Sequence, residues 1–492
     1  MPMRKTVLAF DFGASSGRAV LAHFENGRMT LEEVHRFSND PVPANGHFYW
    51  DVLRLLHEIR IGLQKGWAAG GYDSVGLDTW GVDYALIGKN GDLLGNPHHY
   101  RDTRTTGLAK ASGAYISPAR LYELTGNQIM NINTAFQLFE DTRSRPELLD
   151  AAQCFLLMPD LLAYLLTGDL SAERSIAGTT QLFDPRTGTW SQEVIHALGI
   201  PERLFPAVVP TGTVKGMLAA PLCEELGIRS VPVIAVCGHD TQCAAAAVPA
   251  ADDTPFAFIS CGTWALFGTE LHAPVISPLS AKLGVSNEVG FGGTVDVLKN
   301  ITGLWLMQET RRTLRRLGRD YSYAQMEEMA ASAKPAQCFI DTDASIFGTP
   351  GDMVSRIRSW CSESGQPVPQ DDAAVLRCIY ESLACRFRDA LDEITACTER
   401  PLRRIYMLGG GVRDALLCQL TADVCGIPVL TGPVEATAMG NAAIQLMASG
   451  AVENLASARA VIGASVPVRT YAPDPGNAYI YNNYQKIIKK EV

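Results

Sequence analysis

A short stretch near the start of the chain carries residue types that handle phosphate. The apolar run 7–10 leads into Asp11, a turn of small residues follows at 13–17, and a second apolar run begins after Arg18. Small residues let backbone N–H groups and hydroxyls come close to phosphate oxygens. A carboxylate at a strand end can hold a hydrated Mg²⁺ ion. The pattern predicts ATP chemistry, although the chain has no G-x-x-x-x-G-K-[ST] motif.

Two other interpretations of this turn stay open. Glycine-rich hairpin turns are most often only turns. The same residues fit the G-x-S-x-G nucleophile pattern of hydrolases, with Ser15 as nucleophile, but that pattern requires a helix directly after the serine. Asn26-Gly27 separates two β-prone runs downstream, which is typical of a hairpin. This context disfavours a nucleophilic Ser15.

A second candidate is Asp240, which stands between the apolar run 231–236 and an alanine-rich run that predicts a helix. Ligands gather at the carboxyl ends of strands in open α/β sheets. A carboxylate there can accept the proton of a substrate hydroxyl as its oxygen attacks a γ-phosphoryl group. His239 and Thr241 could orient such a substrate. The alternative is that Asp240 only caps the following helix.

Two further turns of small residues could also lie against a nucleotide. Gly262-Thr263 joins two apolar runs in the layout of the first turn, and Gly409–Gly411 lies between a predicted strand and a predicted helix. Strand, glycines and helix form a geometry that lets a nucleotide lie against the backbone. A simple packing turn explains the three glycines equally well. These features together favour a kinase. They are two hairpin turns that could hold phosphate, a possible base in Asp240 and a possible metal-binding carboxylate in Asp11.

The elements that must position these residues alternate along the chain. Apolar spacing predicts helices over 51–63 and 372–398, and strands at 74–77 and 405–408. Hairpins occur among these elements. The expected fold class is therefore α/β with mixed sheets.

Length predicts more than one domain, because 492 residues exceed a single comfortable core. The Pro-containing break at 249–255 precedes a run laid out like the first one. We therefore predict an N-terminal domain over 1–248, with the substrate side and the base, and a C-terminal, nucleotide-side domain over 249–492. The repeated layout suggests internal duplication.

Composition excludes several classes of protein. Hydrophobic residues make up 47% and charged residues 19%, which is ordinary for a globular protein. The net charge is −10 and no basic run occurs, so nucleic-acid binding is not expected. No apolar stretch is long enough to span a membrane. The first residues do not resemble a signal peptide, which predicts a cytoplasmic protein.

The twelve cysteines are scattered, and none form a C-x-x-C pair. In a long chain without a secretory signal they are expected to be buried thiols. Cys361 and Cys378 flank a Pro-containing loop and could meet, but a disulfide there is disfavoured on redox grounds. No cluster of histidine and cysteine has metal-ligand spacing, so no such metal site is expected.

In their order and spacing, the motifs resemble the FGGY carbohydrate kinases, from about residue 5 to about residue 470. The segments that carry the resemblance are Asp11–Arg18, Trp50-Asp51, Gly76–Asp83, Tyr100–Arg104, Leu157–Asp160, Gly238–Thr241, Ser260–Trp264, Leu298–Trp305 and Gly409–Gly411. The resemblance implies two ribonuclease-H-like domains of the actin, hexokinase and Hsp70 superfamily, with an interdomain cleft. Within these segments, Gly13–Arg18 and Asp78–Asp83 discriminate between sugar kinases of the family, and they resemble the members that phosphorylate L-rhamnulose at its 1-hydroxyl in L-rhamnose catabolism.

The resemblance also implies roles for individual residues, with ATP and Mg²⁺ as the cofactors. Asp240 would be the catalytic base and Asp11 would face the metal. The ketose would be held by Gly81, His239, Asp240, Thr241 and Asn300. ATP would be contacted by Ala14, Ser15, Ser16, Gly17, Arg18, Thr263, Gln308 and Gly410.

Two alternatives to L-rhamnulose phosphorylation remain from the sequence. One is a kinase for another ketose such as L-fuculose, because the orientation of a single hydroxyl decides between such sugars. The other is an actin-like ATPase without a sugar substrate, which would need no base at Asp240. The sequence contains no signal for the oligomeric state.

Overall fold

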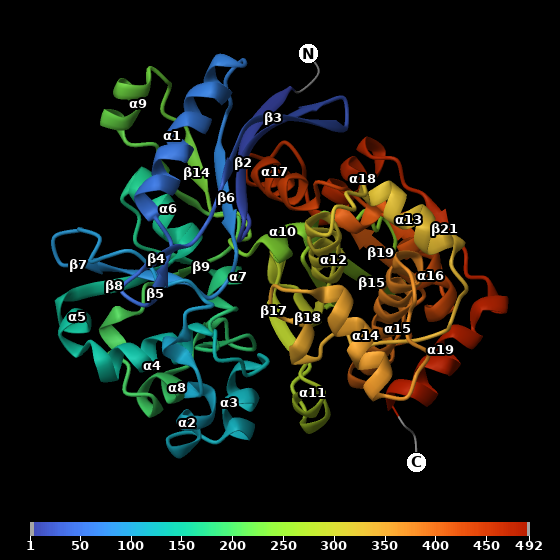
Figure 1. The fold of residues 1–492 in the computed structure, drawn as a ribbon. Helices are drawn as coiled ribbons and strands as arrows, with labels where there is room; N and C mark the ends of the chain where they lie inside the picture. Colours follow the sequence, from blue (N-terminus) through green and yellow to red (C-terminus); the bar gives the residue numbers. More distant parts are fainter. Residues whose placement is uncertain (1–3, 490–492) are drawn as a thin grey trace. The chain divides into compact units, whose positions relative to one another are not determined.

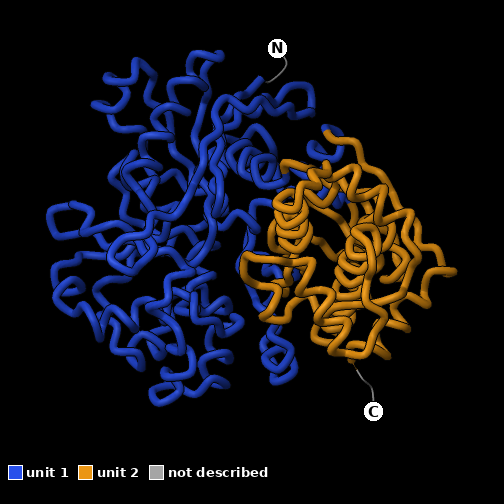
Figure 2. The backbone as a smooth tube through the Cα atoms, in the orientation of Figure 1, with its two compact units in different colours: residues 1–251, 270–297, 436–465 blue, residues 252–269, 298–435, 466–492 orange. Residues whose placement is uncertain are grey.

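The computed structural model describes residues 4–489, and it divides into two compact units (Figures 1 and 2). Each unit is assembled from separate stretches of the chain. Unit 1 contains Met1–Ala251, Glu270–Val297 and Ala436–Ser465, and unit 2 contains Asp252–Thr269, Leu298–Glu435 and Val466–Val492. The two predicted domains also include residues 1–3 and 490–492, which lie outside the described residues.

Unit 1 is built on a six-stranded mixed sheet. The strand order is β13 (Val214–Met217), β14 (Pro232–Ile234), β6 (Val75–Thr79), β1 (Lys5–Phe12), β2 (Ser16–Glu25) and β3 (Arg28–Ser38). β6 pairs in parallel with both β1 and β14, whereas β1, β2 and β3 are antiparallel. The carboxyl ends of β1, β6 and β14 therefore meet at one edge of the sheet, where ligands of open α/β sheets gather.

Four helices pack on this sheet, namely α1 (Val52–Ala68), α6 (Met158–Thr167), α10 (Asp240–Ala246) and α17 (Ala436–Ala448). α3 (Pro118–Thr125) and α4 (Thr134–Ser144) instead share a separate apolar cluster with Tyr84 and Phe155. Asp51 caps the N-terminus of α1, because its side chain accepts a hydrogen bond from the Arg54 N–H. α17 contacts α10 so closely that a Cβ on Gly440 would lie 1.8 Å from the Cys243 carbonyl oxygen. Only glycine fits at that position.

Unit 2 repeats the strand order of unit 1. Its strands run β18 (Val295–Thr302), β16 (Trp264–Leu271), β15 (Phe256–Cys261), β19 (Arg404–Leu408), β20 (Val429–Thr431) and β21 (Thr470–Tyr471). β15 pairs antiparallel with β16 and parallel with β19, which pairs in parallel with β20. β15 thus occupies the position that β1 has in unit 1, which confirms the repeated layout predicted from sequence.

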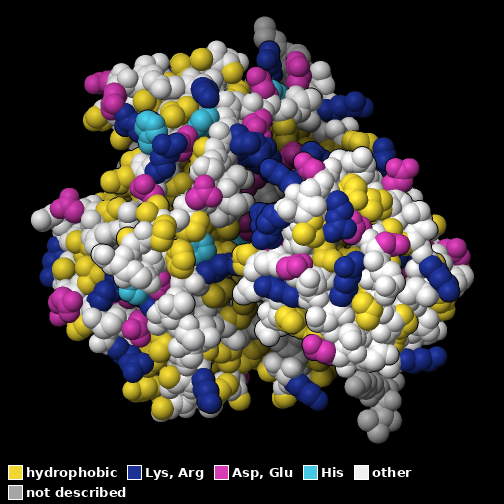
Figure 3. Space-filling model, in the orientation of Figure 1, with side chains coloured by type: hydrophobic (Ala, Val, Ile, Leu, Met, Phe, Trp, Pro, Cys, Tyr) yellow, Lys and Arg dark blue, Asp and Glu magenta, His cyan; other side chains and the backbone are white. Residues whose placement is uncertain are grey.

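The core of unit 2 surrounds a long helix. The helices are α12 (Trp305–Arg316), α13 (Tyr323–Ser332), α14 (Met353–Glu363), α15 (Asp372–Thr398), α16 (Ala415–Cys425) and α19 (Tyr479–Tyr484). α15 has the bounds expected from sequence, and its predicted apolar face is buried. On the visible face of this unit, positive and negative side chains are interspersed (Figure 3). Between residues 4 and 489, no helix has both the length and the apolar character to cross a bilayer.

Candidate active site

Two carboxylates lie side by side at the carboxyl ends of β1 and β6. Asp11 and Asp78 are register partners in the parallel pairing of these strands. Burial raises the pKa of Asp78 well above its usual range, and the neighbouring Asp11 carboxylate adds to this effect. Asp78 Oδ2 accepts a 2.6 Å hydrogen bond from Asn441 of α17, whereas its buried Oδ1 has no partner. An unpaired buried carboxylate oxygen is costly unless a proton or a cation satisfies it.

Asp240 lies one strand further along this edge, at the start of α10. The N-cap of α10 is His239, so the alternative in which Asp240 caps the helix is wrong. Oδ1 of Asp240 accepts hydrogen bonds from the N–H and the hydroxyl of Thr241, at 2.6 and 3.2 Å. The Asp240 side chain is 32% exposed to solvent. Burial raises the pKa of Asp240. The nearby charge of His239 acts to lower this pKa, whereas the Asp11 carboxylate raises it further. Such a carboxylate can accept a proton from a hydroxyl.

His239 forms an ion pair with a carboxylate from β17 (Ser286–Val289). Its Nδ1 lies 2.9 Å from Oε2 of Glu288, without the alignment of a hydrogen bond, and its Nε2 lies 3.5 Å from Oδ1 of Asp240. Burial disfavours the imidazolium, but the carboxylates around it, Glu288 first and then Asp240 and Glu173, together raise the pKa of His239 to about 9. His239 is therefore a cation at neutral pH. No sequence motif marks Glu288, and this residue is not among the site residues predicted from the sequence.

A second glutamate holds the strand end in place. Oε2 of Glu173 accepts a 2.9 Å hydrogen bond from the Gly238 N–H, directly before His239. The same carboxylate caps α7 (Arg174–Ala177) through the Ser175 and Ile176 N–H groups. A Cβ on Gly238 would lie 2.9 Å from the Pro159 ring. Glycine at 238 and the buried Glu173 thus fix where the His239-Asp240 pair stands.

The predicted phosphate turn is a hairpin between β1 and β2. A strand follows Ser15, and this excludes the hydrolase arrangement, which needs a helix there. Arg18 donates to Oδ2 of Asp11 through Nε at 3.0 Å and Nη2 at 2.6 Å. A Cβ on Gly17 would lie 2.2 Å from the Phe37 ring, so packing alone requires this glycine. The predicted ATP contacts on or beside the turn are Ala14, Ser15, Ser16, Gly17 and Arg18.

The turn after β6 carries backbone strain. Val82 has φ +68°, which is rare for a β-branched residue. Its N–H donates to Oγ1 of Thr179 at 3.2 Å, and a Cβ on Gly81 would lie 3.2 Å from the same side chain. Strained turns persist where their surroundings over-determine them, and they are common in ligand sites. The geometry agrees with a binding role for Gly81, which stays a prediction.

Asp83 ends this turn and orients two tryptophans. Its Oδ2 accepts hydrogen bonds from the indole N–H groups of Trp50 and Trp80, at 2.6 and 3.0 Å. Its Oδ1 accepts a 2.9 Å hydrogen bond from Nε2 of Gln137. Burial raises the pKa of Asp83 to about 6, although these hydrogen bonds oppose the shift. The two indole rings lie 4.0 Å apart next to the strained turn.

We expect Asp83→Asn to lower the free energy of unfolding by about 1–3 kcal/mol, because an amide nitrogen would face buried donors. Urea unfolding followed by tryptophan fluorescence measures this directly. Asp92→Asn, the same change at an exposed carboxylate, is the matched control and should have no effect. Equal stability of the Asp83 and Asp92 variants would contradict the proposed role of Asp83 as an acceptor.

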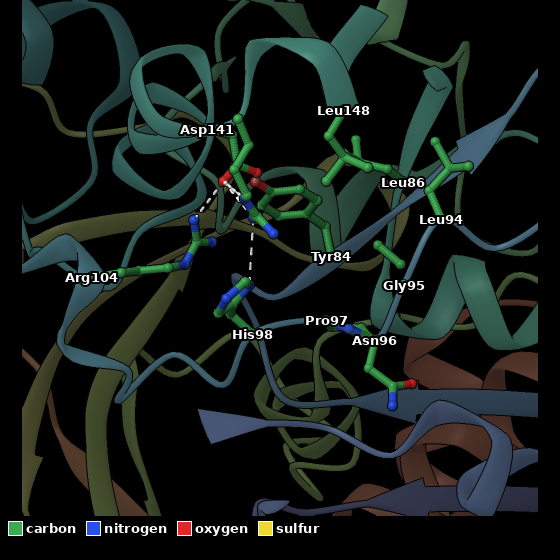
Figure 4. Close-up of a pocket in the computed structure, with 12 residues that line it drawn as sticks. Tyr84, Leu86, Leu94, Gly95, Asn96, Pro97, His98, Arg104, Asp141 and Leu148 are labelled. Atoms are coloured by element: carbon green, nitrogen blue, oxygen red, sulfur yellow. Dashed lines mark hydrogen bonds and ion pairs between the residues drawn. The ribbon is translucent and has the colours of Figure 1, made fainter. Parts of the chain in front are cut away.

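Arg104, which donates to Oε1 of Gln137 at 3.0 Å, also lines a polar pocket. Figure 4 shows this pocket with Tyr84, His98 and Asp141 around it. Arg104 and Tyr84 also donate to Asp141, at 2.7 and 2.5 Å. Burial, with help from the nearby arginines, lowers the pKa of His98 to about 3, so its ring is neutral. The cavity measures about 40 Å³, room for a few waters but not for a sugar. We therefore assign it a structural role.

In unit 2, three predicted residues come together near the end of β15. Thr263 donates to Oε1 of Gln308, in the first turn of α12, at 3.4 Å. The Leu304 N–H donates to the Gly262 carbonyl at 2.9 Å. A Cβ on Gly410 would lie 3.7 Å from Leu304. The hairpin turn, the start of α12 and the Gly409–Gly411 turn therefore adjoin one another. Asn300 lies on β18 of the same unit, and the roles of all these residues toward a ligand stay predictions.

The cysteines are buried and free, as predicted, in all twelve positions. The prediction that Cys361 and Cys378 could meet is confirmed, because their Sγ atoms and that of Cys338 lie within 4.8 Å of one another. The three residues come from a loop and two helices of unit 2. Nothing in the sequence pointed to Cys338 as the third member.

Comparison with known proteins gives full-length matches. The model of the N-terminal domain of the FGGY family of carbohydrate kinases matches residues 6–247, and the model of its C-terminal domain matches residues 257–449. The chain is 42% identical over 472 residues to a rhamnulokinase of Bacteroides thetaiotaomicron, covering 96% of each chain. It is 38% identical over 491 residues to a rhamnulokinase of Enterococcus faecalis, covering 99% of this chain and 98% of that protein.

Solved structures agree in fold at low sequence identity. A ligand-bound xylulose kinase from Lactobacillus acidophilus has a TM-score of 0.82 at 17% identity, covering 99% of this chain and 97% of that one. Plasmodium falciparum glycerol kinase with ADP has a TM-score of 0.80 at 14% identity, covering 99% of this chain and 98% of that one. These two likenesses concern the fold alone.

Proposed function

Because this chain belongs to the FGGY family of carbohydrate kinases, we propose that it phosphorylates L-rhamnulose at the 1-hydroxyl. The products are L-rhamnulose 1-phosphate and ADP, in the catabolism of L-rhamnose. The observation that carries the choice of sugar is the 36–42% identity, over 95–99% of the chain, to proteins named rhamnulokinase. The reaction is assigned to the cytoplasm, where ATP and reducing conditions for twelve free thiols are found.

Asp240 is the proposed catalytic base. Its Oδ1 is occupied by Thr241, and among the described residues no hydrogen bond goes to Oδ2. Oδ2 accepts the proton of the 1-hydroxyl while the sugar oxygen attacks the γ-phosphorus of ATP. The bond between the γ-phosphorus and the bridging oxygen then breaks, and ADP leaves with that oxygen. The carboxylic acid formed on Asp240 releases its proton to solvent after the product departs.

His239 is proposed to keep this base ionised and to bind the sugar. Its imidazolium lies 3.5 Å from Asp240, and a neighbouring cation favours the charged form of a carboxylate. Glu288 in turn keeps His239 protonated. Gly81, Thr241 and Asn300 complete the proposed sugar contacts. The strained turn at Val82 supports the inclusion of Gly81.

ATP is proposed to be contacted by the residues of the two hairpin turns and by Gln308 and Gly410. Mg²⁺ requires oxygen donors, and the strand ends supply Asp11 beside the unpartnered Oδ1 of Asp78. The residues present therefore fit the ion, with Asp11 as the proposed holder of its water ligands. When bound, Mg²⁺ neutralises charge on the β- and γ-phosphates.

A coupled ADP-release assay over a panel of sugars tests this proposal. The panel holds L-rhamnulose, L-fuculose, L-ribulose, D-xylulose and glycerol, each with MgATP. We expect the highest kcat/KM for L-rhamnulose. A preference for another ketose would overturn the substrate but keep the kinase. ATP hydrolysis that no sugar stimulates would overturn the kinase and favour an ATPase.

A further inference from the structure

A short segment of unit 1, residues 173–179, contacts both stretches of this unit that supply the proposed sugar contacts. One stretch is residues 81–82, which we call the sugar turn. The other is residues 238–241, which contain Asp240. The two stretches are far apart in the sequence, and no residue of 173–179 is among the site residues predicted from it. The segment therefore has a position that the proposed reaction has not yet used.

The beginning of the segment holds the stretch before the base. Oε2 of Glu173 accepts a 2.9 Å hydrogen bond from the Gly238 N–H. The hydroxyl of Ser175 donates to the same oxygen at 2.6 Å and accepts a longer hydrogen bond, of 3.5 Å, from the His239 N–H. This end of the segment therefore fixes the backbone that leads into Asp240.

Thr179 ends the segment against the sugar turn. Its hydroxyl donates to the Ile176 carbonyl at 2.8 Å, which leaves a lone pair of Oγ1 to accept the Val82 N–H at 3.2 Å. A Cβ on Gly81 would lie 3.2 Å from Thr179, which is tighter than ordinary packing. Thr179 therefore contacts both residues of the turn, and it accounts for the glycine at position 81.

The sugar turn has a shape that needs such support. The Asp83 N–H donates to the Gly81 carbonyl at 2.9 Å across Val82, whose φ is +68°. This is the arrangement of a γ-turn with positive φ, the rare and strained form. A strained turn persists only where its surroundings hold it. Here the hydroxyl of Thr134 donates to the Val82 carbonyl at 2.6 Å, and Thr179 accepts the N–H.

We propose that Thr179 is a positioning residue for the sugar, which holds the backbone of the sugar turn where the ketose binds. The inference rests on the proposed function, because Gly81 is one of the proposed sugar contacts. Gly81 and Val82 are partly exposed, whereas Trp80 and Asp83 on either side are buried. The strained backbone is thus the part of the turn that is open to a ligand. Thr179 is only 7% exposed, so it acts through the turn.

Thr179→Val in the full-length protein tests the proposal, because valine keeps the shape of threonine and removes the hydroxyl. A backbone N–H left against a methyl group loses free energy equivalent to about 10-fold in an equilibrium constant. We expect KM for L-rhamnulose to rise about 10-fold, with kcat and KM for ATP near their wild-type values. Thr179→Ser keeps the hydroxyl and should restore the wild-type KM.

Two further measurements do not depend on turnover. Sugar binding without ATP can be titrated by tryptophan fluorescence, since the Trp80 indole donates to Asp83 directly after the sugar turn. The dissociation constant should rise by the same factor in Thr179→Val. Hydrogen exchange followed by mass spectrometry should be faster in the peptide that contains Val82, because its N–H loses its acceptor.

Thr180→Val is the matched control. The hydroxyl of Thr180 donates to the Ala177 carbonyl at 2.7 Å and accepts the Leu182 N–H at 3.1 Å, so valine removes the same two kinds of hydrogen bond. Neither partner belongs to the sugar turn. We expect this variant to lose stability in urea as Thr179→Val does, but to keep the wild-type KM for L-rhamnulose and the wild-type exchange at Val82.

A wild-type KM for L-rhamnulose in Thr179→Val would overturn the proposal. Equal increases in Thr179→Val and Thr180→Val, or in Thr179→Val and Thr179→Ser, would also overturn it, because they would reflect lost stability or packing. If Thr179→Val does not fold, Thr179→Ala removes the same hydroxyl with a smaller side chain and gives the same test. A wild type that phosphorylates no sugar would overturn the proposed function as well, whereas a wild type selective for L-rhamnulose beside an unaffected variant overturns this inference alone.

Discussion

Asp240→Asn is expected to lower kcat by about 10²–10⁴-fold, the usual contribution of a general base. The amide keeps the shape of the side chain, and its oxygen can still accept hydrogen bonds from Thr241. It cannot accept a proton from the attacking hydroxyl. Since the substitution changes only the step in which the proton moves, KM for ATP should stay near the wild-type value. Steady-state kinetics with L-rhamnulose and MgATP measures both quantities.

Asp253→Asn provides the control, because it makes the same chemical change at an exposed carboxylate. It should leave kcat unchanged. The pH profile of the wild type offers an independent check. Because burial raises the pKa of Asp240, the acid limb of kcat/KM should fall at a higher pH than an ordinary aspartate would give. Wild-type turnover in the Asp240 variant would refute the assignment of the base.

Glu288→Gln is expected to remove a pH-dependent part of the stability. The pKa of His239 is about 9 in the folded protein and about 6.5 in an unfolded chain. Below pH 6.5 the stabilisation from this proton is complete, and it is lost as the pH rises through 9. At 1.36 kcal/mol per pKa unit the contribution is roughly 3 kcal/mol. The variant should therefore be much less stable than the wild type at pH 6, and the difference should shrink by pH 9.5.

Urea unfolding at these two pH values measures the effect. Asp141→Asn is the matched control in unit 1, since it removes a buried carboxylate from Arg104 and Arg145. Arginines do not titrate in this range. The control should lose similar stability at both pH values. A Glu288 variant that loses the same stability at pH 6 and pH 9.5 would show that Glu288 does not set the charge of His239.

Local patterns in the sequence determined much of this protein. The 372–398 helix was predicted with its observed bounds, because a long apolar stripe at helical spacing specifies a helix by itself. The β1–β2 hairpin was also predicted, and with it the exclusion of Ser15 as a nucleophile. The strand–turn–helix around Asp240 followed from an apolar run next to an alanine-rich one. The predicted ligand contacts came from the family resemblance, and they stay predictions.

Only the tertiary structure decided which distant groups meet. Glu288 reaches His239 because β17 belongs to unit 1, and Glu173 reaches Gly238 through a buried side chain that no motif marks. Cys361 and Cys378 were expected to be able to meet, but only the packing of unit 2 brings Cys338 to them, with the three Sγ atoms within 4.8 Å of one another. The physical reason is the same in each case. Local propensity and periodicity act between residues close in sequence, whereas charge pairing and thiol clustering depend on distances that packing of the whole unit sets.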